Sequence, residues 1–279
     1  MNDPLPQTLT SITGTNTQPV AGLAVQVKDA SVTFDEGDQP VHALQNVNLN
    51  IAAGEFVSFI GPSGCGKTTL MRVIADLEQV TSGTVLVNGV SAAEARQQGA
   101  YGYVFQAPAL YPWRTVLKNV TLPLEIKGMG ASEREDVAMR QLANVGLAGF
   151  EGKFPWQLSG GMQQRVSIAR ALGFEPKILM MDEPFGALDE ITRDRLNEQL
   201  LQLWAKERRT VIFVTHSIPE AAFLSSKIVV MSARPGRVVE VIESNLPVNR
   251  TLDIRETPAF VEIAHRIRQT LRKGDSYHD

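Results

Sequence analysis

The sequence contains the segment Gly61-Pro62-Ser63-Gly64-Cys65-Gly66-Lys67-Thr68-Thr69, which matches the pattern G-x-x-x-x-G-K-[ST] at every fixed position. A short apolar run, 55–60, precedes it, and a run typical of a helix, 70–75, follows it. Glycines in such a strand–turn–helix let backbone N–H groups converge on an anion, which the helix dipole also favours. Lys67 adds a positive charge, and the Thr68 hydroxyl is suited to ligate Mg²⁺. A chance glycine-rich turn explains less of this pattern, so we expect the segment, called the phosphate loop below, to bind a nucleoside triphosphate.

Composition limits the possible classes of protein. The 279 residues are 43% hydrophobic and 20% charged, as is ordinary for a globular protein with a substantial core. The net charge of −3 gives no basic footprint, so we expect no nucleic-acid partner. A single cysteine suits a reducing compartment. The sequence lacks a signal-peptide pattern at its start, and no apolar run approaches the ~20 residues of a membrane span. We therefore expect a soluble, cytoplasmic protein that reaches a membrane only through a partner.

The order of the expected elements indicates the fold class. Residues 1–22 are rich in Thr, Pro, Asn and Gln without periodicity, which predicts a disordered leader. Strand patterns follow at 24–27, 31–34, 47–51, 84–89 and 101–105, and three strand–helix alternations begin at 178–181, 210–215 and 227–232. Such alternation is typical of a parallel sheet with helices on its faces, and hence of an α/β protein.

Helices are expected in three further places. Within 114–158, Ser132 followed by Glu133 predicts an N-terminal cap, with Val137, Leu142 and Val145 as the apolar members. After the first alternation, one helical stripe carries Leu196, Leu200, Leu203 and Trp204. The run 258–273 places Phe260, Ile263, Ala264, Ile267 and Leu271 on one face. We expect this last helix to dock on the domain, because Glu262 and the modest number of cations disfavour a membrane-surface helix.

Two acids end the apolar run 178–181, Asp182 and Glu183. A buried strand would deliver Asp182 beside the phosphate loop, where its carboxylate can hold Mg²⁺ through water. Glu183 is then placed to act as general base for the attacking water. On their own, the two acids could equally cap the next turn, but the phosphate loop upstream favours the catalytic interpretation.

A second glycine-containing segment, Leu158-Ser159-Gly160-Gly161-Met162-Gln163-Gln164-Arg165, predicts a helix that Ser159 caps. Its first N–H groups are unobstructed because glycines have no side chain. This second anion site is too far along the chain to share the phosphate of the first without a partner subunit, and the alternative is an ordinary capped helix. The segment resembles the signature motif of ATP-binding cassette (ABC) proteins.

This resemblance covers roughly 23–245. It implies a P-loop NTPase with a RecA-like core, an antiparallel β subdomain, a helical signature subdomain at about 107–173 and a C-terminal helical extension at 246–279. It also implies ATP and Mg²⁺ as cofactors. Two copies of the chain would form a head-to-tail homodimer, with each ATP held between the phosphate loop of one copy and Ser159, Gly160 and Gly161 of the other.

The same resemblance implies roles for single residues. Gln106 matches the Q-loop, which implies a catalytic and Mg²⁺-contacting role, and Asp189 in Ala187-Leu188-Asp189 matches the D-loop at the nucleotide. His216 matches the switch histidine beside the γ-phosphate, and Phe34 matches an aromatic residue that stacks on adenine. A structural histidine and a core phenylalanine are the alternatives. The chain departs from many cassettes at Met162, where they carry Gln, but this leaves the Ser-Gly-Gly intact.

Within the family, the segments 110–116, 181–189 and 232–237 and the Met162 variant resemble the ATPase subunits of bacterial nitrate/sulfonate/taurine-type importers. Such subunits work with a pair of membrane permease subunits and a periplasmic substrate-binding protein, at the inner face of the cell membrane. The segment after Gln106, with Tyr111 and Trp113, would receive the permease, unless its aromatic residues pack on the helical subdomain instead. The implied function is ATP-driven uptake of a small solute, nitrate-, sulfonate- or taurine-like or a pyrimidine-type vitamin precursor.

Two other functions stay open. A soluble cassette ATPase acting on nucleic acid or the ribosome usually carries long coiled-coil insertions, or two cassettes with a basic linker, and this sequence has neither. An exporter subunit is disfavoured only by the importer-like loops.

Cys65 lies beside Lys67 at the start of the expected helix. Positive potential there would favour the thiolate and raise its reactivity toward a maleimide, and bound ATP would slow the labelling. The alternative is that Cys65 only fills a variable loop position with a small side chain.

Overall fold

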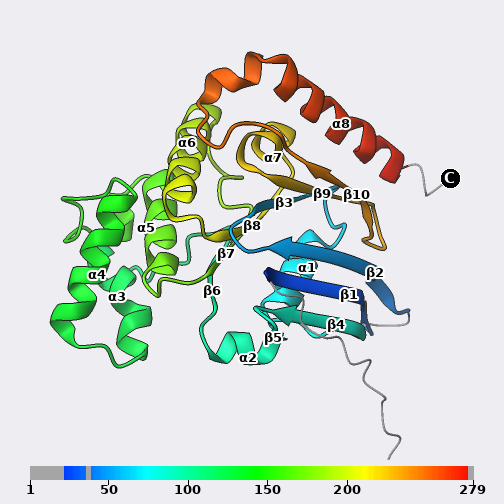
Figure 1. Cartoon of the computed structure of the whole chain (residues 1–279). Coiled ribbons are helices and arrows are strands. Elements are labelled where there is room, and N and C mark those ends of the chain that lie inside the picture. The colour runs from blue at the N-terminus through cyan, green and yellow to red at the C-terminus, as the bar shows by residue number, and fades with distance from the viewer. Residues whose placement is uncertain (1–21, 36–38, 276–279) are drawn as a thin grey trace, which may run out of the picture.

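The computed structural model describes residues 22–35 and 39–275, so the predicted leader lies outside it apart from Gly22 (Figure 1). An antiparallel sheet has the order β2-β1-β4-β5 and contains β1 (Leu23–Phe34), β2 (Val41–Ala52), β4 (Ser82–Val87) and β5 (Val90–Ser91). A second sheet has the order β10-β9-β3-β8-β7-β6 and contains β3 (Phe56–Ile60), β6 (Tyr101–Val104), β7 (Ile178–Asp182), β8 (Thr210–Thr215), β9 (Lys227–Met231) and β10 (Val238–Glu243).

The helices are α1 (Lys67–Ile74), α2 (Ala92–Gln97), α3 (Val116–Ile126), α4 (Ala131–Asn144), α5 (Gly160–Leu172), α6 (Glu190–Glu207), α7 (Ile218–Leu224) and α8 (Pro258–Asp275). Two 3-10 turns, η1 (Pro155–Gln157) and η2 (Leu252–Glu256), precede α5 and α8. None of the helices in the described ranges is long and apolar enough to cross a bilayer.

The predicted parallel sheet is confirmed, with β10 as an antiparallel strand at one edge. The residues of β3, β7, β8 and β9 are almost all buried, because successive side chains point to opposite faces and both faces are covered. One face, which includes Phe56, Leu179 and Phe213, packs in a core with α3, α5, α6, α7 and α8. The other face, which includes Phe59, Met180 and Val214, packs in a second core with α1 and the antiparallel sheet.

The prediction of two separate strands at 24–27 and 31–34 is wrong, since both belong to β1. The pairing of β1 with β2 shifts register between Val27 and Val32, and Asp29 adopts a left-handed backbone with φ 48°. The backbone N–H of Asp29 donates a hydrogen bond to Asn48 Oδ1 at 3.0 Å. The polar interruption in the sequence is therefore a bulge that bends one long strand, rather than a turn between two.

The helices α3, α4 and α5 pack on one another as a helical lobe beside the sheet and share its core (Figure 1). The predicted apolar members Val137, Leu142 and Val145 are buried there, as expected. The cap at Ser132 is wrong, because α4 begins at Ala131 with Gly130 as its N-cap and no side-chain cap bond. Extended Gly130 already satisfies the entry geometry, which places Ser132 inside the first turn.

The helix α8 docks on the domain as predicted. It runs across β9, β10 and α7, with Phe260 and Ile267 buried in the core that the other helices share (Figure 1). Where α8 passes β10, Arg266 pairs with Glu240 at 2.5 Å, and the buried Thr270 also donates to that carboxylate. These bonds lower the pKa of Glu240, with the Thr270 hydroxyl as the larger cause.

Parallel pairing explains why distant segments meet at one edge. Because β3, β6, β7, β8 and β9 run in the same direction, the residues that follow them emerge at their shared carboxyl edge, where ligands bind in open α/β sheets. The phosphate loop follows β3, Glu183 follows β7, and His216 follows β8.

Candidate functional site

A cavity of about 290 Å³ lies at this carboxyl edge. Its lining consists of residues from the phosphate loop, one face of the antiparallel sheet and two other loops: Phe34, Val41, Ala43, Ser63, Gly64, Cys65, Gly66, Lys67, Thr68, Thr69, Glu183 and Arg234. Phe34 thus shares a cavity with the phosphate loop, although Phe34 lies in the antiparallel sheet and the loop follows β3 of the parallel sheet. Phe34 and Val41 are paired across β1 and β2, which places both at one end of the lining.

The phosphate loop wraps the start of α1 with its backbone. Gly66 is the N-cap in a left-handed conformation, φ 93°, and a Cβ there would lie 2.8 Å from the Ala43 carbonyl oxygen. Only glycine fits both the dihedral angle and the contact. Lys67 is 5% exposed, and its Nζ donates to the carbonyls of Gly61 at 2.9 Å and Pro62 at 2.8 Å. A buried ammonium is therefore fixed at an unobstructed helix N-terminus, where anions bind.

Thr68 and Asp182 meet as the sequence predicts. Thr68 Oγ1 donates to Asp182 Oδ1 at 2.8 Å, across the boundary between α1 and β7. Burial raises the pKa of Asp182, and the Thr68 hydroxyl opposes that shift. The pair offers hard oxygen ligands, and Mg²⁺ commonly takes only one or two protein ligands beside substrate phosphates and water. The residues fit Mg²⁺ in that mode, while no cluster of three His, Cys, Asp or Glu ligands occurs in 22–35 and 39–275.

Glu183 and His216 face each other at the ends of β7 and β8. Glu183 Oε2 lies 3.3 Å from His216 Nδ1, and the imidazole is 56% exposed, which disfavours a purely structural histidine. Glu183 itself has a left-handed backbone with φ 43°, which is costly for a residue with a side chain. The N–H of Glu183 bonds Val214 O at 3.0 Å, so the neighbouring strand holds this conformation.

A buried acid behind His216 escaped the sequence analysis. Glu220 is 5% exposed, and its carboxylate accepts a hydrogen bond from Thr215, the residue before His216. Burial raises the pKa of Glu220, and the hydrogen bond from Thr215 and the charge of Arg193, 3.9 Å away, only partly offset this. Arg193 also donates to Leu188 O at 2.7 Å, just before Asp189. The only sequence signal is an acid in the first turn after His216, which an ordinary helix start would equally explain.

The signature segment lies elsewhere in the chain. Ser159 Oγ accepts from Met162 N at 3.3 Å, so the predicted cap of α5 is confirmed. Ser159 and Gly160 are exposed, and α5 stands well apart from α1 (Figure 1). A Cβ on Gly161 would approach Thr192 at 3.0 Å, so α5 begins against the start of α6, which Asp189 caps. The structure therefore brings Ser159, Gly160, Gly161 and Asp189 together, but away from the phosphate loop.

Two further residues singled out in the sequence are Gln106 and Cys65. Gln106 follows β6 at the same edge of the sheet but is exposed and is not part of the cavity lining. The reactive thiolate expected at Cys65 is wrong. Cys65 is 1% exposed, and burial raises the pKa of its thiol, while Lys67 Nζ at 3.7 Å opposes that shift without reversing it. The helix start does attract negative charge, but loss of hydration outweighs it at this position.

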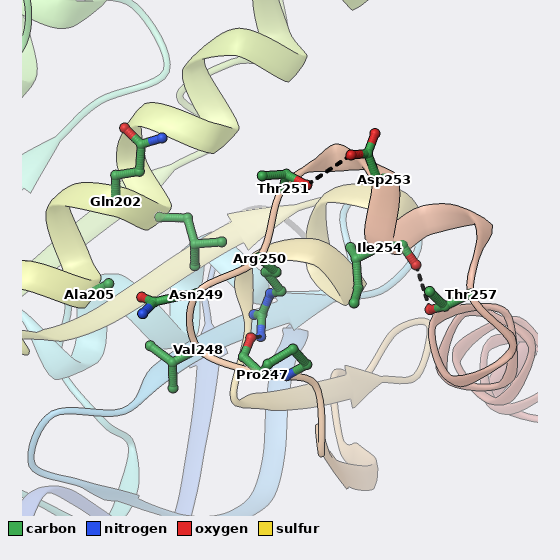
Figure 2. Close-up of a pocket in the computed structure, with 11 residues that line it drawn as sticks. Gln202, Ala205, Pro247, Val248, Asn249, Arg250, Thr251, Asp253, Ile254 and Thr257 are labelled. Carbon is green, nitrogen blue, oxygen red and sulfur yellow. Dashed lines mark hydrogen bonds between the residues drawn. The ribbon is translucent and has the colours of Figure 1, made fainter.

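A larger cavity of about 590 Å³ lies away from this edge, between α6 and the segment 247–257. Figure 2 shows its rim, where Thr251 bonds Asp253 and Thr257 bonds Ile254. The Arg250 guanidinium in its lining is engaged by the backbone carbonyls of Phe223, Ser225, Leu246 and Pro247. Burial lowers the pKa of Arg250 to about 10. This arginine anchors the segment to the end of α7 rather than offering its charge to a ligand.

Known proteins resemble the chain over most of its length. The aliphatic sulfonates import ATP-binding protein SsuB of Bacillus cereus is 40% identical over 252 residues, which are 90% of this chain and 97% of that protein. The nitrate import ATP-binding protein NrtD of Synechocystis is 42% identical over 255 residues, 89% of this chain and 95% of that protein.

A solved structure resembles the fold as well. It is a dimeric post-hydrolysis state of an ATP-binding cassette with bound ADP and phosphate, with a TM-score of 0.70 and 38% identity over 78% of this chain and 98% of that one. The sequence profile of the ABC transporter family matches residues 44–186. Together with a phosphate loop, acids and histidine at one sheet edge, these likenesses identify the chain as an ATP-binding and ATP-hydrolysing member of the ABC transporter family.

Proposed function

We propose that this ATPase supplies the energy for a bacterial importer, in which it drives uptake of a small solute through membrane permease partners. The observation that carries the proposal is the likeness to a sulfonate-import and a nitrate-import ATP-binding protein over about nine tenths of the chain. The solute is then nitrate-, sulfonate- or taurine-like, or a pyrimidine-type vitamin precursor. Its contacts belong to the permease and a periplasmic substrate-binding protein, and the ATPase works at the inner face of the membrane.

The residues at the sheet edge suggest how hydrolysis proceeds. Lys67 neutralises charge on the terminal phosphates, while Thr68 and Asp182 would hold Mg²⁺, which supplies further charge neutralisation. Glu183 accepts a proton from the attacking water, whose oxygen forms a bond to the γ-phosphorus as the bond to the ADP oxygen breaks. His216, in contact with Glu183, holds the γ-phosphate and the carboxylate in one arrangement. Gln106 and Phe34 keep their predicted roles at the Mg²⁺ and the adenine.

The exposed signature segment supports a site completed by a second copy of the chain. Ser159 and Gly160 present an accessible helix start, and Asp189 lies beside them on α6. In the proposed dimer these residues meet the nucleotide held by the phosphate loop of the partner. The dimeric state of the solved relative supports this arrangement.

The segment after Gln106 supports a permease contact. Trp113 is 70% exposed and Tyr111 is 42% exposed, and their rings lie 5.1 Å apart. The alternative that Trp113 packs on the helical lobe is therefore wrong. The fully buried Asn119 donates to the carbonyls of Tyr111 and Arg114, which fixes the loop while leaving the rings outside. Rigid, exposed aromatic side chains are typical anchors at protein interfaces.

Reconstitution tests the proposal. The full chain is combined in liposomes with a candidate permease and a candidate substrate-binding protein from the same organism, and uptake of labelled nitrate, taurine, an alkanesulfonate and a pyrimidine is measured. We expect ATP-dependent uptake of one of these solutes, and ATPase activity stimulated by the loaded binding protein. Stimulation by nucleic acid or ribosomes, or movement of solute only in the opposite direction, would support the soluble or exporter function instead.

A further inference from the structure

The loop 232–237 lies beside the phosphate loop because of the order of the strands. It follows β9, which pairs in parallel with β3 so that Val230 is opposite Ile60. The two loops therefore leave the sheet at the same edge and next to each other. Within the loop, Ser232 Oγ accepts from Arg237 N at 3.1 Å and donates to Pro235 O at 3.1 Å, which closes it into a compact turn.

This turn contacts both sides of the nucleotide cavity. Gly236 N donates to Ala43 O at 3.0 Å, and Gln45 N donates to Gly236 O at 3.0 Å, so the turn is bonded to β2. On the other side, a Cβ on Gly236 would lie 2.1 Å from the carbonyl oxygen of Cys65, a contact that only glycine avoids. The turn thus joins the strand next to Phe34 to the phosphate loop.

Arg234 projects from this turn into the cavity lining. Its Nε donates to Gly64 O at 2.9 Å, which fixes the plane of the guanidinium against the phosphate loop. The side chain is exposed, and its two Nη groups make no hydrogen bond within the described part of the chain. The next residue but one, Gly236, is bonded to Ala43 of β2, and Arg234 lines the same cavity as Phe34 and Val41.

We propose that Arg234 is a nucleotide-binding residue whose Nη groups donate to the phosphate nearest the nucleoside, the α-phosphate. The planar fork of a guanidinium suits phosphate oxygens, and the bond from Nε leaves both Nη groups available without further ordering. Lys67, Thr68 and Glu183 serve the terminal phosphates, so Arg234 holds the opposite end of the phosphate chain. This inference rests on the ATP binding of the family and not on the importer proposal.

Affinity for two nucleotides tests it. Binding of Mg-ADP and of a non-hydrolysable Mg-ATP analogue to the full chain is measured by calorimetry for wild type, Arg234→Gln and Arg237→Gln. We expect Arg234→Gln to weaken both nucleotides by about tenfold, the usual effect of losing a charge-assisted hydrogen bond. Arg237→Gln removes the same charge from the same turn, but Arg237 is bonded to Gln45 instead, and it should leave both affinities unchanged.

Salt separates direct binding from an indirect effect on the phosphate loop. Because Arg234 is exposed, a direct ion pair is screened, and the ratio of wild-type to Arg234→Gln affinity should shrink as NaCl rises. A ratio that stays constant with salt would mean that Arg234 only supports Gly64. Unchanged affinities for both nucleotides, or weakening of the ATP analogue alone, would also overturn the assignment. Failure of wild type to bind either nucleotide would count against the ATPase itself.

Discussion

Two helix starts in this chain present glycines and free N–H groups, yet they differ in almost every other respect. At α1, the N-cap Gly66 has no capping side chain, and the neighbouring Lys67 is buried among backbone carbonyls. Glu183, which follows β7, and Phe34 of β1 also line the cavity. At α5, Ser159 caps the helix in the ordinary way, and Ser159 and Gly160 are exposed.

The difference teaches what each start requires. The phosphate loop is surrounded by residues of its own chain that carry charge, a carboxylate next to an imidazole, and an aromatic ring. At the start of α5, Gly161 lies against Thr192 of α6, near the cap Asp189, and Gln163 donates to the carbonyl oxygen of Pro155. An anion held there would gain little beyond one helix dipole, worth about 0.3–1 kcal/mol. We therefore expect α1 to bind nucleotide in one chain and α5 to contribute only between two chains.

The largest effect is expected at the complete site. Glu183→Gln should lower ATP hydrolysis by about 10²–10⁴-fold, because the amide cannot take the proton of the attacking water. ATP binding should persist, and Mg-ATP should then trap the dimer, visible as a shift in size-exclusion chromatography. A variant that stays monomeric and hydrolyses ATP normally would remove Glu183 from the role of base.

Mixing two inactive variants tests the division of labour between α1 and α5. Lys67→Ala and Ser159→Arg should each be inactive alone, but an equimolar mixture should recover up to about a quarter of the wild-type rate, since half of randomly paired dimers contain one intact composite site. The matched control is the double variant Lys67→Ala/Ser159→Arg mixed with active Cys65→Ser protein. In that mixture, a dimer of one chain of each kind has no intact composite site. No recovery in the first mixture would break the comparison, because both helix starts would then be needed within the same chain.

Trp113, in the loop after Gln106, extends the comparison of the two helix starts to a third region of the chain. Trp113→Ala should leave basal ATPase and melting temperature near wild type, because the ring is 70% exposed and outside the cavity. In the reconstituted transporter it should reduce uptake several-fold, as loss of an interface aromatic commonly does. Loss of a buried aromatic would instead cost about 3–5 kcal/mol and lower the folding yield. Normal uptake by a stable variant would contradict the permease contact.

The smallest effect is expected at Cys65. Since this thiol is 1% exposed and its pKa is raised, a maleimide at neutral pH should label it slowly. Ser159→Cys in a Cys65→Ser background moves the only thiol to the start of α5 and should be labelled much faster. Mass spectrometry gives both rates, and Cys65→Ser alone should keep ATPase activity. Equal labelling rates would mean that the two helix starts are equally accessible.

Local patterns in the sequence predict the elements that carry the site. The apolar runs before the phosphate loop and before Asp182 predict buried strands, and both strands form as expected. Ser159 caps its helix because the cap depends on three neighbouring residues only. Family resemblance supplies the dimer and the roles of Gln106, Asp189 and His216, and these roles stay predictions.

Errors arise where the deciding partner is distant in sequence. Cys65 loses its hydration because strands β2 and β9 and their loops close over it, and the sequence near Cys65 does not indicate this. Arg234 lines the cavity, and Glu220 bonds the residue before His216. Both positions depend on the order of strands in the sheet, which the local sequence does not indicate. The bulge at Asp29 depends on Asn48 in the neighbouring strand.

Glu183 has a left-handed backbone with φ 43°, so the residue proposed to serve hydrolysis also lowers the stability of the fold. Glycine adopts this conformation without cost and asparagine adopts it more readily than glutamate, so Glu183→Gly or Glu183→Asn should relieve strain of about 1 kcal/mol or more. Both substitutions also remove the proposed proton acceptor. A selection of heat-resistant variants of this protein, carried out without an activity assay, will therefore enrich inactive enzymes at position 183.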